Sequence, residues 1–434
     1  MGDREISKDG IKYAMPSKDT QQVATYFTKE GTLEAWQSVA QLYAAPNNEV
    51  RAFSLLLGFG CPMFKFLGEG GTILHLVNRL SGVGKSAAQG LGLSVWGHPK
   101  EGMSKMDDTL NSRMHRLGVM NNVLFCMDEI TKMTHDEVGT LAYSISQGKG
   151  KARMESSTNR ERLNLTCWSV PCITSGNASI HGILQANSMS PDGEIMRVME
   201  MRVEPIVGIT KEESDRLFIE VLQHNYGHAG ELVIEYILHN KEECYKRLKI
   251  IQVQFDLIMG YGNPERFYSL LTTTALWGGE IANLLGLVAI PLAPIVDFLI
   301  EHNGLTKQEV CTAIQLSSGD IGAFINEHSG NHSLVLDTRP SNIPGDLRAP
   351  LQSPRGELMI RVELDTQHMY ITVSSLRSWC ADHRLSFVDM VKELEVSGVV
   401  INQTSIHMAE GTAIKSPAVR AIVLDMTKIE GVGI

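Results

Sequence analysis

The sequence predicts an α/β fold in which helices cover a mostly parallel sheet, followed by a mostly helical region and a small α+β domain. Short apolar runs such as GTILHLVN, NVLFCMDE and VMEMRVEP alternate with helical patterns between residues 68 and 207. Such alternation is typical of parallel strands joined by helices. From residue 211 to about residue 327 the pattern is almost wholly helical.

The expected domain boundaries follow changes in this pattern. The first twenty residues are polar and without period, so we expect a mobile lead, and two helical patterns separated by the breaker PNN come next. A segment rich in Pro, Gly, Ser and Asn precedes a final order of two strands, two helices and two strands, which suits a winged-helix-like domain. The expected parts are a polar lead with a helical N-terminal region (1–67), a sheet-containing core (68–207), a helical lid or subdomain (208–327), a linker (328–356) and a winged-helix-like domain (357–434).

Composition and charge argue against several classes of protein. Hydrophobic residues make up 43 % of the chain and the apolar runs are short, so we expect no membrane partner. No export signal opens the chain, which predicts a cytoplasmic location. Seven cysteines without a CxxC pair argue against a disulfide framework or a zinc ribbon. The net charge of −10 argues against broad nonspecific binding to nucleic acid, but leaves room for a local basic stripe.

A glycine-rich segment, SGVGKS, lies between a strand pattern and a helical pattern. A phosphate-binding loop in this context uses backbone N–H groups at a helix N-terminus, a lysine that reaches the β and γ phosphates, and a hydroxyl that holds Mg²⁺. These parts are present as Gly82, Val83, Gly84, Lys85 and Ser86. The alternative is a glycine turn before a helix, and Arg79 stands where such loops usually open with a glycine.

A second motif follows further along the chain. NVLFCMDEI is an apolar strand pattern that ends in Asp128 and Glu129, the form of a Walker B strand, in which one carboxylate holds the metal's water shell and the other polarises the attacking water. An exposed turn after a strand would explain the acidic pair alone, but not both motifs in this order. The two together predict a P-loop ATPase core that binds ATP, with Mg²⁺ held by Ser86 and Asp128.

These residues resemble a known family. The run from FSLLLGFGCPMFKF through SGVGKSAAQGLGLSVWGHP, then NNVLFCMDEI, SQGKGKAR, WSVPCITSGN and NYGHAGE, resembles the P-loop domain of unknown function found in phage, plasmid and genomic-island replication proteins. That domain is commonly described as a helicase and is often fused behind a primase-polymerase. The resemblance covers roughly residues 32–291 and implies an AAA+ or superfamily-three-like core. The family usually has a glycine where this chain has Arg79, and a Ser-Thr-Gly-Glu stretch where this chain has residues 174–177.

The resemblance and the order of the motifs imply further site residues. Asn177, with Ser175, follows an apolar strand and is expected between the ends of the P-loop and Walker B strands, similar to the polar sensor of AAA+ proteins; a Ser-Gly-Asn turn is the alternative. Arg197 precedes a short strand, the place of an arginine finger that reaches a neighbouring subunit's nucleotide, against the alternative of a surface arginine. Arg266 begins a helix and is either an in-cis nucleotide sensor or a structural residue. The lone His228 is expected to be structural.

The basic segment KGKARMESSTNRERLNL is predicted to form a hairpin between the Walker B and sensor strands. Ring helicases of superfamily three use a hairpin at this place to hold single-stranded DNA, and backbone phosphates are bound by charge without sequence-specific geometry. The candidate DNA-binding residues are Lys149, Lys151 and Arg153. A solvated charged loop is the alternative.

The expected function is that of an ATP-dependent ring helicase or translocase acting on single-stranded or forked DNA in the replication of a phage or mobile element in a bacterial host cell. Analogy with ring helicases implies a homo-oligomer, most simply a hexamer, and a primase-polymerase domain as a partner. Two alternatives stay open: an ATPase switch or loader without unwinding activity, and a DNA-binding scaffold whose nucleotide site has decayed.

Overall fold

The computed structural model divides into two compact units, Met1–Asn303 (unit 1) and Gly304–Ile434 (unit 2). It describes residues 2–18, 20–68, 70–105, 107–131, 133–150, 153–154, 161–162, 166–187, 192–206, 209–314, 317–339, 348–383 and 387–429.

Unit 1 is built on a four-stranded sheet in the order β4-β7-β3-β8. Its strands are β3 (Gly71–Val77), β4 (Phe125–Met127), β7 (Val170–Gly176) and β8 (Val198–Arg202). All neighbouring pairs are parallel, and Val77 lies opposite both Gly176 and Arg202, so the carboxyl ends of three strands meet at one edge. The parallel sheet expected from the alternating pattern is present, and its strands are buried on both faces, as their continuous apolar sequences require.

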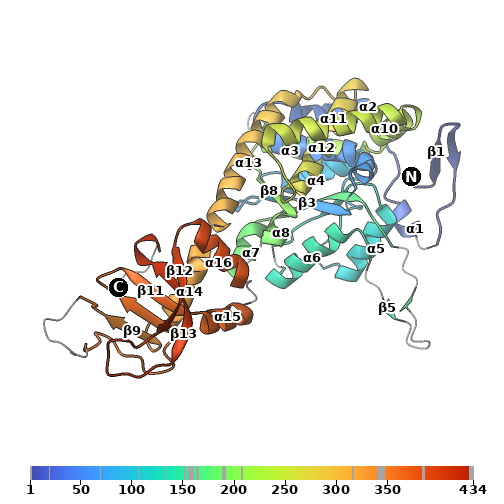
Figure 1. Cartoon of the computed structure of the whole chain (residues 1–434). Helices are drawn as coiled ribbons and strands as arrows, with labels where there is room; N and C mark the ends of the chain where they lie inside the picture. The colour runs from blue at the N-terminus through green and yellow to red at the C-terminus, as the bar shows by residue number, and fades with distance from the viewer. Residues whose placement is uncertain are drawn as a thin grey trace. The chain divides into compact units, whose positions relative to one another are not determined.

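Helices cover both faces of this sheet. In unit 1 they are α1 (Gln21–Ala24), α2 (Leu33–Ala40), α3 (Glu49–Gly60), α4 (Lys85–Ser94), α5 (Leu110–Met120), α6 (His135–Gln147), α7 (Ile180–Asn187), α8 (Asp192–Ile195), α9 (Lys211–Asp215), α10 (His228–His239), α11 (Lys241–Met259), α12 (Arg266–Leu284) and α13 (Leu292–Ile314), which runs into unit 2. Shorter turns are η1 (Gln41–Ala44), η2 (Cys61–Leu67), the π-helix η3 (Arg216–Val221) and η4 (Leu222–His224). Figure 1 shows α3, α11 and α12 on one side of the sheet and α5, α6 and α7 on the other.

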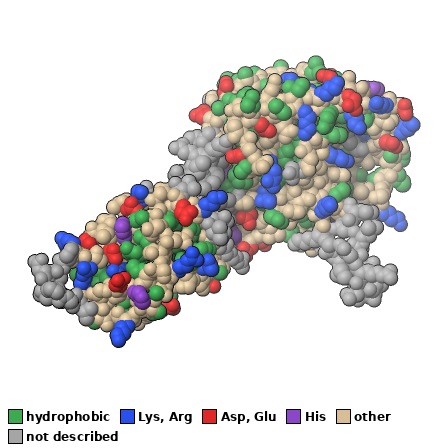
Figure 2. Space-filling view, in the orientation of Figure 1, with side chains coloured by type: hydrophobic (Ala, Val, Ile, Leu, Met, Phe, Trp, Pro, Cys, Tyr) green, Lys and Arg blue, Asp and Glu red, His purple; other side chains and the backbone are tan. Residues whose placement is uncertain are grey.

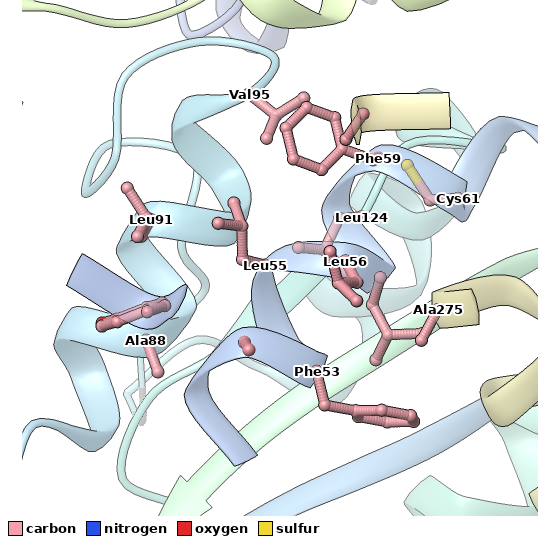
Figure 3. Packing of buried hydrophobic residues seen from close by; sticks show 14 of the residues in the cluster. Phe53, Leu55, Leu56, Phe59, Cys61, Ala88, Leu91, Val95, Leu124 and Ala275 are labelled. Atoms are coloured by element: carbon pink, nitrogen blue, oxygen red, sulfur yellow. The ribbon is translucent and has the colours of Figure 1, made fainter. Parts of the chain in front are cut away.

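Helix α3 is the central helix of the core. Every residue from Val50 to Gly60 is buried, and the helix packs between α4 and α12 (Figure 3). Close backbone contacts make this packing possible, since a Cβ on Gly278 would lie 2.2 Å from the carbonyl oxygen of Leu56. With η2 it forms a 19-residue segment, Glu49–Leu67, that meets the length and hydropathy of a membrane span, with 78 % of the apolar window buried inside the unit. The apolar runs are therefore longer than the sequence analysis allowed, and the burial is that of a core helix.

The N-terminal lead differs from the expectation of a mobile segment. Strands β1 (Arg4–Ser7) and β2 (Gly10–Tyr13) form an antiparallel hairpin with a two-residue loop. Gly10 has a φ of +109°, which permits this tight turn. Arg4 Nη1 lies 2.5 Å from a carboxylate oxygen of Glu231 on α10. The two short strands show no apolar alternation from which the sequence could predict them. The hairpin is instead attached to the rest of unit 1 by this ion pair.

Unit 2 contains a five-stranded sheet in the order β12-β13-β11-β10-β9. Its elements are α14 (Ser317–His328), β9 (Ser333–Leu336), β10 (Ile360–Glu363), β11 (His368–Thr372), α15 (Val373–Asp382), α16 (Phe387–Val396), β12 (Val400–His407), β13 (Ala418–Asp425) and η5 (Met426–Lys428). The predicted order of two strands, two helices and two strands is present from β10 to β13, and α14, α15 and α16 contribute to one apolar core with the sheet.

The expected linker needs a correction. Strand β9 lies inside residues 328–356, is buried throughout, and pairs in parallel with β10. Four residues of strand are too short a signal to stand out from the surrounding Pro, Gly, Ser and Asn. The winged-helix interpretation of this unit stays a prediction.

Candidate functional site

The predicted site residues gather at the carboxyl edge of the unit 1 sheet. The glycine-rich loop follows β3, Asn177 follows β7, and the acidic pair follows β4. Because β7 lies between β3 and β4, Asn177 comes between the other two motifs. Ligands of open parallel sheets bind at this edge.

The glycine-rich loop has the backbone of an anion-binding turn. Gly82 and Gly84 have φ values of +77° and +91°, a region that favours glycine, and Gly84 is the N-cap of α4. The first amides of α4 thus face the loop with the positive end of the helix dipole. Arg79 is exposed and is not among the residues with positive φ, so the backbone at the head of the loop does not require a glycine.

Lys85 is buried, with 8 % of its surface exposed. Its Nζ donates to the carbonyl oxygens of Asn78 (2.8 Å) and Leu80 (3.2 Å) and to Asn177 Oδ1 (2.7 Å). Burial lowers the pKa of the Lys85 ammonium, and the carboxylates of Glu129 and Asp128 oppose that shift. The lysine therefore joins the loop to the strand that lies between the two motifs.

Asp128 and Ser86 form the second contact between motifs. Ser86 Oγ lies 3.0 Å and 3.1 Å from the two carboxylate oxygens of Asp128, and Ser175 Oγ donates to Asp128 Oδ1 at 2.5 Å. A hydroxyl beside a carboxylate suits Mg²⁺, which usually takes one or two protein oxygens together with phosphates and water. Among the described residues, no group of three or more His, Cys, Asp or Glu could hold a metal ion by itself. The donor set thus fits a metal bound together with a phosphate.

Glu129 has an unusual backbone for a glutamate. Its φ is +53°, and its N–H donates to Ser175 Oγ at 3.2 Å, while the N–H of Ile130 donates to the carbonyl oxygen of Ser175 at 2.9 Å. A non-glycine residue in this region costs roughly 1–2 kcal/mol and persists only where neighbours fix it. Ser175 therefore holds both acidic residues in place.

Asn177 is fixed from two sides. Its N–H donates to Thr131 Oγ1 at 2.7 Å, and the next carbonyl, that of Ala178, lies 3.1 Å from His75 Nε2. His75 is fully buried on β3, its Nδ1 lies 2.8 Å from Thr174 Oγ1, and burial lowers the pKa of its ring to about 4. A neutral ring that donates from Nε2 and accepts at Nδ1 satisfies both contacts.

Arg51, on α3, lies beneath the loop and is 3 % exposed. Its Nη2 donates to the carbonyl oxygens of Val83, at 2.8 Å, and Glu204, and its Nη1 donates to Asn48 Oδ1 at 3.1 Å. Burial lowers the pKa of the Arg51 guanidinium. Sequence reasoning missed Arg51, His75 and Thr131. The signals for the first two were a charge inside the apolar run VRAFSLLLGFG and a histidine inside the apolar strand TILHLV; Thr131 gave none.

Two predicted arginines lie away from this edge. Arg197 precedes β8, so the length of that strand, roughly 17 Å, separates it from the loop that follows β3. Its Nε donates to Ser146 Oγ at 2.9 Å, and its Cζ lies 5.4 Å from the centre of the Phe267 ring. Arg266 lies over the same ring at 4.6 Å. The in-cis role of Arg266, which the sequence left open beside a structural one, stays a prediction. An in-trans role of Arg197 stays a prediction.

The predicted DNA-binding segment is only partly described. Strands β5 (Arg153–Met154) and β6 (Glu161–Arg162) pair antiparallel, and Lys149, which precedes them in the chain, forms a bridge with Cys167, which follows them. Lys149 is exposed. Lys151 lies outside the described residues, as does the side chain of Arg153. Lys and Arg side chains are mixed with Asp and Glu on the face of unit 1 that Figure 2 shows, so this face carries no broad basic patch.

The segments SVWGHP and NYGHAGE meet in the structure. The His98 ring packs edge-on against Tyr226 at 5.1 Å, and the N–H of Gly227 donates to the carbonyl oxygen of Ser94 at 2.8 Å. His228 Nε2 lies 3.1 Å from the carbonyl oxygen of Glu30. These contacts are structural, as expected for His228, and they tie the end of α4 to the start of α10.

The fold of the chain can be compared with those of known proteins. Residues 1–162 match a family described as a domain of unknown function, DUF927, and this range includes the glycine-rich loop and the acidic pair. A solved structure described as "SCCmec type IV Cch - active helicase" is similar over 93 % of this chain and 72 % of that chain, with a TM-score of 0.60 and 19 % identity. This likeness shows that the two share a fold. A structure described as "The X-ray structure of JCV Helicase" covers 53 % of this chain and 66 % of that chain at 12 % identity, with a TM-score of 0.26, too low to support an argument. No curated protein matches the chain.

Proposed function

We propose that the chain is an ATP-dependent helicase or translocase that acts on single-stranded or forked DNA as a homo-oligomer. One observation carries this proposal: Lys85 contacts Asn177 and Ser86 contacts Asp128, so that three motifs far apart in the sequence converge at one edge of the sheet. The helicase-like fold supports it. A hexamer, a primase-polymerase partner, a role of unit 2 as a winged-helix domain, and a place in the replication of a phage or mobile element in the bacterial cytoplasm belong to the same proposal.

The proposed chemistry follows from the positions of the side chains. Lys85 and the first amides of α4 bind the β and γ phosphates of ATP. Ser86 and Asp128 would hold Mg²⁺, which neutralises charge on these phosphates. Glu129 accepts a proton from the water that attacks the γ-phosphorus, the bond between that phosphorus and the bridging oxygen of ADP breaks, and Asn177 holds Lys85 in place. Arg197 from an adjacent subunit stabilises the charge that develops on the transferred group.

ATP hydrolysis with and without single-stranded DNA tests the proposal. The variants are Lys85→Ala, Lys149→Ala and Lys151→Ala, with Lys246→Ala, an exposed lysine on α11, as the matched control. We expect single-stranded DNA to stimulate ATP hydrolysis by the wild type. Lys85→Ala should abolish hydrolysis, whereas Lys149→Ala and Lys151→Ala should keep the basal rate and lose only the stimulation by DNA.

Unwinding of a forked duplex separates the two classes of ATPase. A chain that hydrolyses ATP but opens no fork is a switch or a loader. An assembled wild-type chain without ATPase activity would refute the nucleotide site and leave the DNA-binding scaffold.

A further inference from the structure

A buried positive charge beneath the glycine-rich loop forms no close ion pair among the described residues, although the Glu204 carboxylate lies near enough to favour it. Arg51 is 3 % exposed, and within the described part of the chain no carboxylate lies within ion-pair distance of its guanidinium. The nearby Glu204 offers its backbone carbonyl to Arg51, while its carboxylate pairs with Arg202 at 2.7 Å. A charge taken out of water without a counter-ion costs several kcal/mol or more. Its retention needs a compensating interaction.

One hydrogen bond of Arg51 falls on the backbone of the loop itself. Its Nη2 donates to the carbonyl oxygen of Val83 at 2.8 Å, and its Nε would lie 3.5 Å from a Cβ placed on Gly84. The Val83–Gly84 peptide is planar and trans, so the N–H of Gly84 points away from the carbonyl that Arg51 holds. A cation on the carbonyl oxygen also polarises the peptide and makes that N–H a stronger donor. Arg51 thereby fixes and strengthens a donor of the loop from below.

The same guanidinium joins two segments of the sheet edge. Nη2 also donates to the carbonyl oxygen of Glu204, two residues beyond β8, and Nη1 donates to Asn48 Oδ1 at the N-cap of α3. A lysine reaches one such acceptor as a point charge, whereas the planar guanidinium reaches several at fixed angles. The loop, α3 and the segment after β8 are therefore held in one arrangement by a single side chain.

We propose that Arg51 is a positioning residue for the polyphosphate of the nucleotide, and that the bound phosphates supply negative charge beyond that of the Glu204 carboxylate, which is already paired with Arg202. The inference rests on the proposed ATP site. Arg51 then affects the affinity for nucleotides that have a β or γ phosphate, and has no effect on the binding of the nucleoside part.

Nucleotide competition tests the inference. A fluorescent ATP analogue is bound to the full chain and displaced by ATP, ADP and AMP, for the wild type, Arg51→Lys and Arg51→Met. The control is Arg361→Met in unit 2: Arg361 is also buried and also donates to two backbone carbonyls, those of Met408 and Glu410, and it differs from Arg51 in pairing with Glu363 at 2.7 Å. A hydrogen bond from a charged group contributes about 1.5–3 kcal/mol, which corresponds to a roughly 10–100-fold loss of affinity for ATP and ADP in Arg51→Met. We expect a smaller loss in Arg51→Lys, unchanged AMP affinity in both, and wild-type affinities in the control.

Each outcome decides the question. Circular dichroism establishes that the variants fold, and if Arg51→Met does not, Arg51→Lys alone carries the comparison. Folded variants that bind ATP as the wild type does, or that lose ATP, ADP and AMP affinity equally, would overturn the inference, because a purely structural role moves all three together. A wild type that binds no ATP would overturn the proposed function and this inference with it.

Discussion

Replacement of His75 by glutamine should make the stability of unit 1 less sensitive to acid. His75 is fully buried, and its Nε2 and Nδ1 contact the Ala178 carbonyl and the Thr174 hydroxyl. At pH 7 the ring is neutral in both the folded and the unfolded chain. Below pH 6.5, the ordinary pKa of histidine, the ring is protonated in the unfolded chain. In the folded chain its pKa is about 4, so it stays neutral until the pH falls to that value. The contribution of the neutral His75 ring to the free energy of unfolding is therefore fully present above pH 6.5 and is lost as the pH falls towards 4.

The size of the expected change in the free energy of unfolding follows from the lowered pKa of His75. Each pH unit within this window removes up to about 1.4 kcal/mol from the free energy of unfolding, so the ring accounts for a loss of about 2 kcal/mol between pH 7 and pH 5. His75→Gln keeps an N–H donor of similar reach but binds no proton. Its free energy of unfolding should be lower than that of the wild type at pH 7, and should decrease by about 2 kcal/mol less on going to pH 5.

Urea unfolding at a series of pH values measures the difference. Tryptophan fluorescence in a Trp379→Phe background reports on unit 1, because Trp379 lies in unit 2 while Trp36, Trp96 and Trp277 are buried in unit 1. His224→Gln is the control, since its side chain is 71 % exposed. Parallel pH profiles for the wild type and His75→Gln would refute the reasoning, because they would mean that the ring is protonated equally in both states.

Three further outcomes are expected. Glu129→Gln should lower the rate of ATP hydrolysis by roughly 10²–10⁴-fold with ATP affinity kept, as measured by a coupled assay beside filter binding, and unchanged hydrolysis would exclude Glu129 as the general base. Thr131→Val removes the acceptor of the Asn177 N–H and should lower kcat by roughly 10-fold, because Asn177 is then misplaced, with KM little changed. A loss of kcat that is accompanied by a loss of thermal stability would contradict a positioning role of Thr131. Gly278→Ala should destabilise unit 1 by about 1–3 kcal/mol, because its Cβ would lie 2.2 Å from the Leu56 carbonyl oxygen, whereas Gly322→Ala, in a helix with open space, should not destabilise unit 2.

What the sequence could predict depends on the range of the interaction. The glycine-rich loop and the acidic pair are short segments beside strand patterns, so their residue types and order were enough to place them at strand ends. The position of Asn177 between them came from resemblance and order along the chain, and it is the strand order β4-β7-β3 that brings its amide to Lys85. Strand β9 and the N-terminal hairpin were missed because four-residue strands carry too little periodicity.

Arg51 shows why the remaining site residues escaped. Its partners Val83 and Glu204 lie 32 and 153 residues away, and no local pattern links such positions. A lone charge in an apolar run marks an anomaly, since a buried arginine needs partners. It does not say which backbone supplies them. Only the packing of α3 against the loop does so.

The distribution of unfavourable local features bears on the alternative of a decayed nucleotide site. Glu129 with a φ of +53°, buried Lys85, buried Arg51 and neutral His75 all lie at or beneath the carboxyl edge of one sheet. The positive φ of Glu129 and the burial of the Lys85 and Arg51 charges each lower stability by about 1–3 kcal/mol, and His75 lowers it in acid, so a fold that no longer uses the edge gains from replacing these residues. The chain keeps all four, and the hydrogen bonds of Ser175, Asn177 and Asn48 support three of them. In the proposed site Lys85 binds phosphate and Glu129 activates water, roles that a scaffold that only binds DNA does not require. This distribution is the reason why we propose a working nucleotide site and not a decayed one.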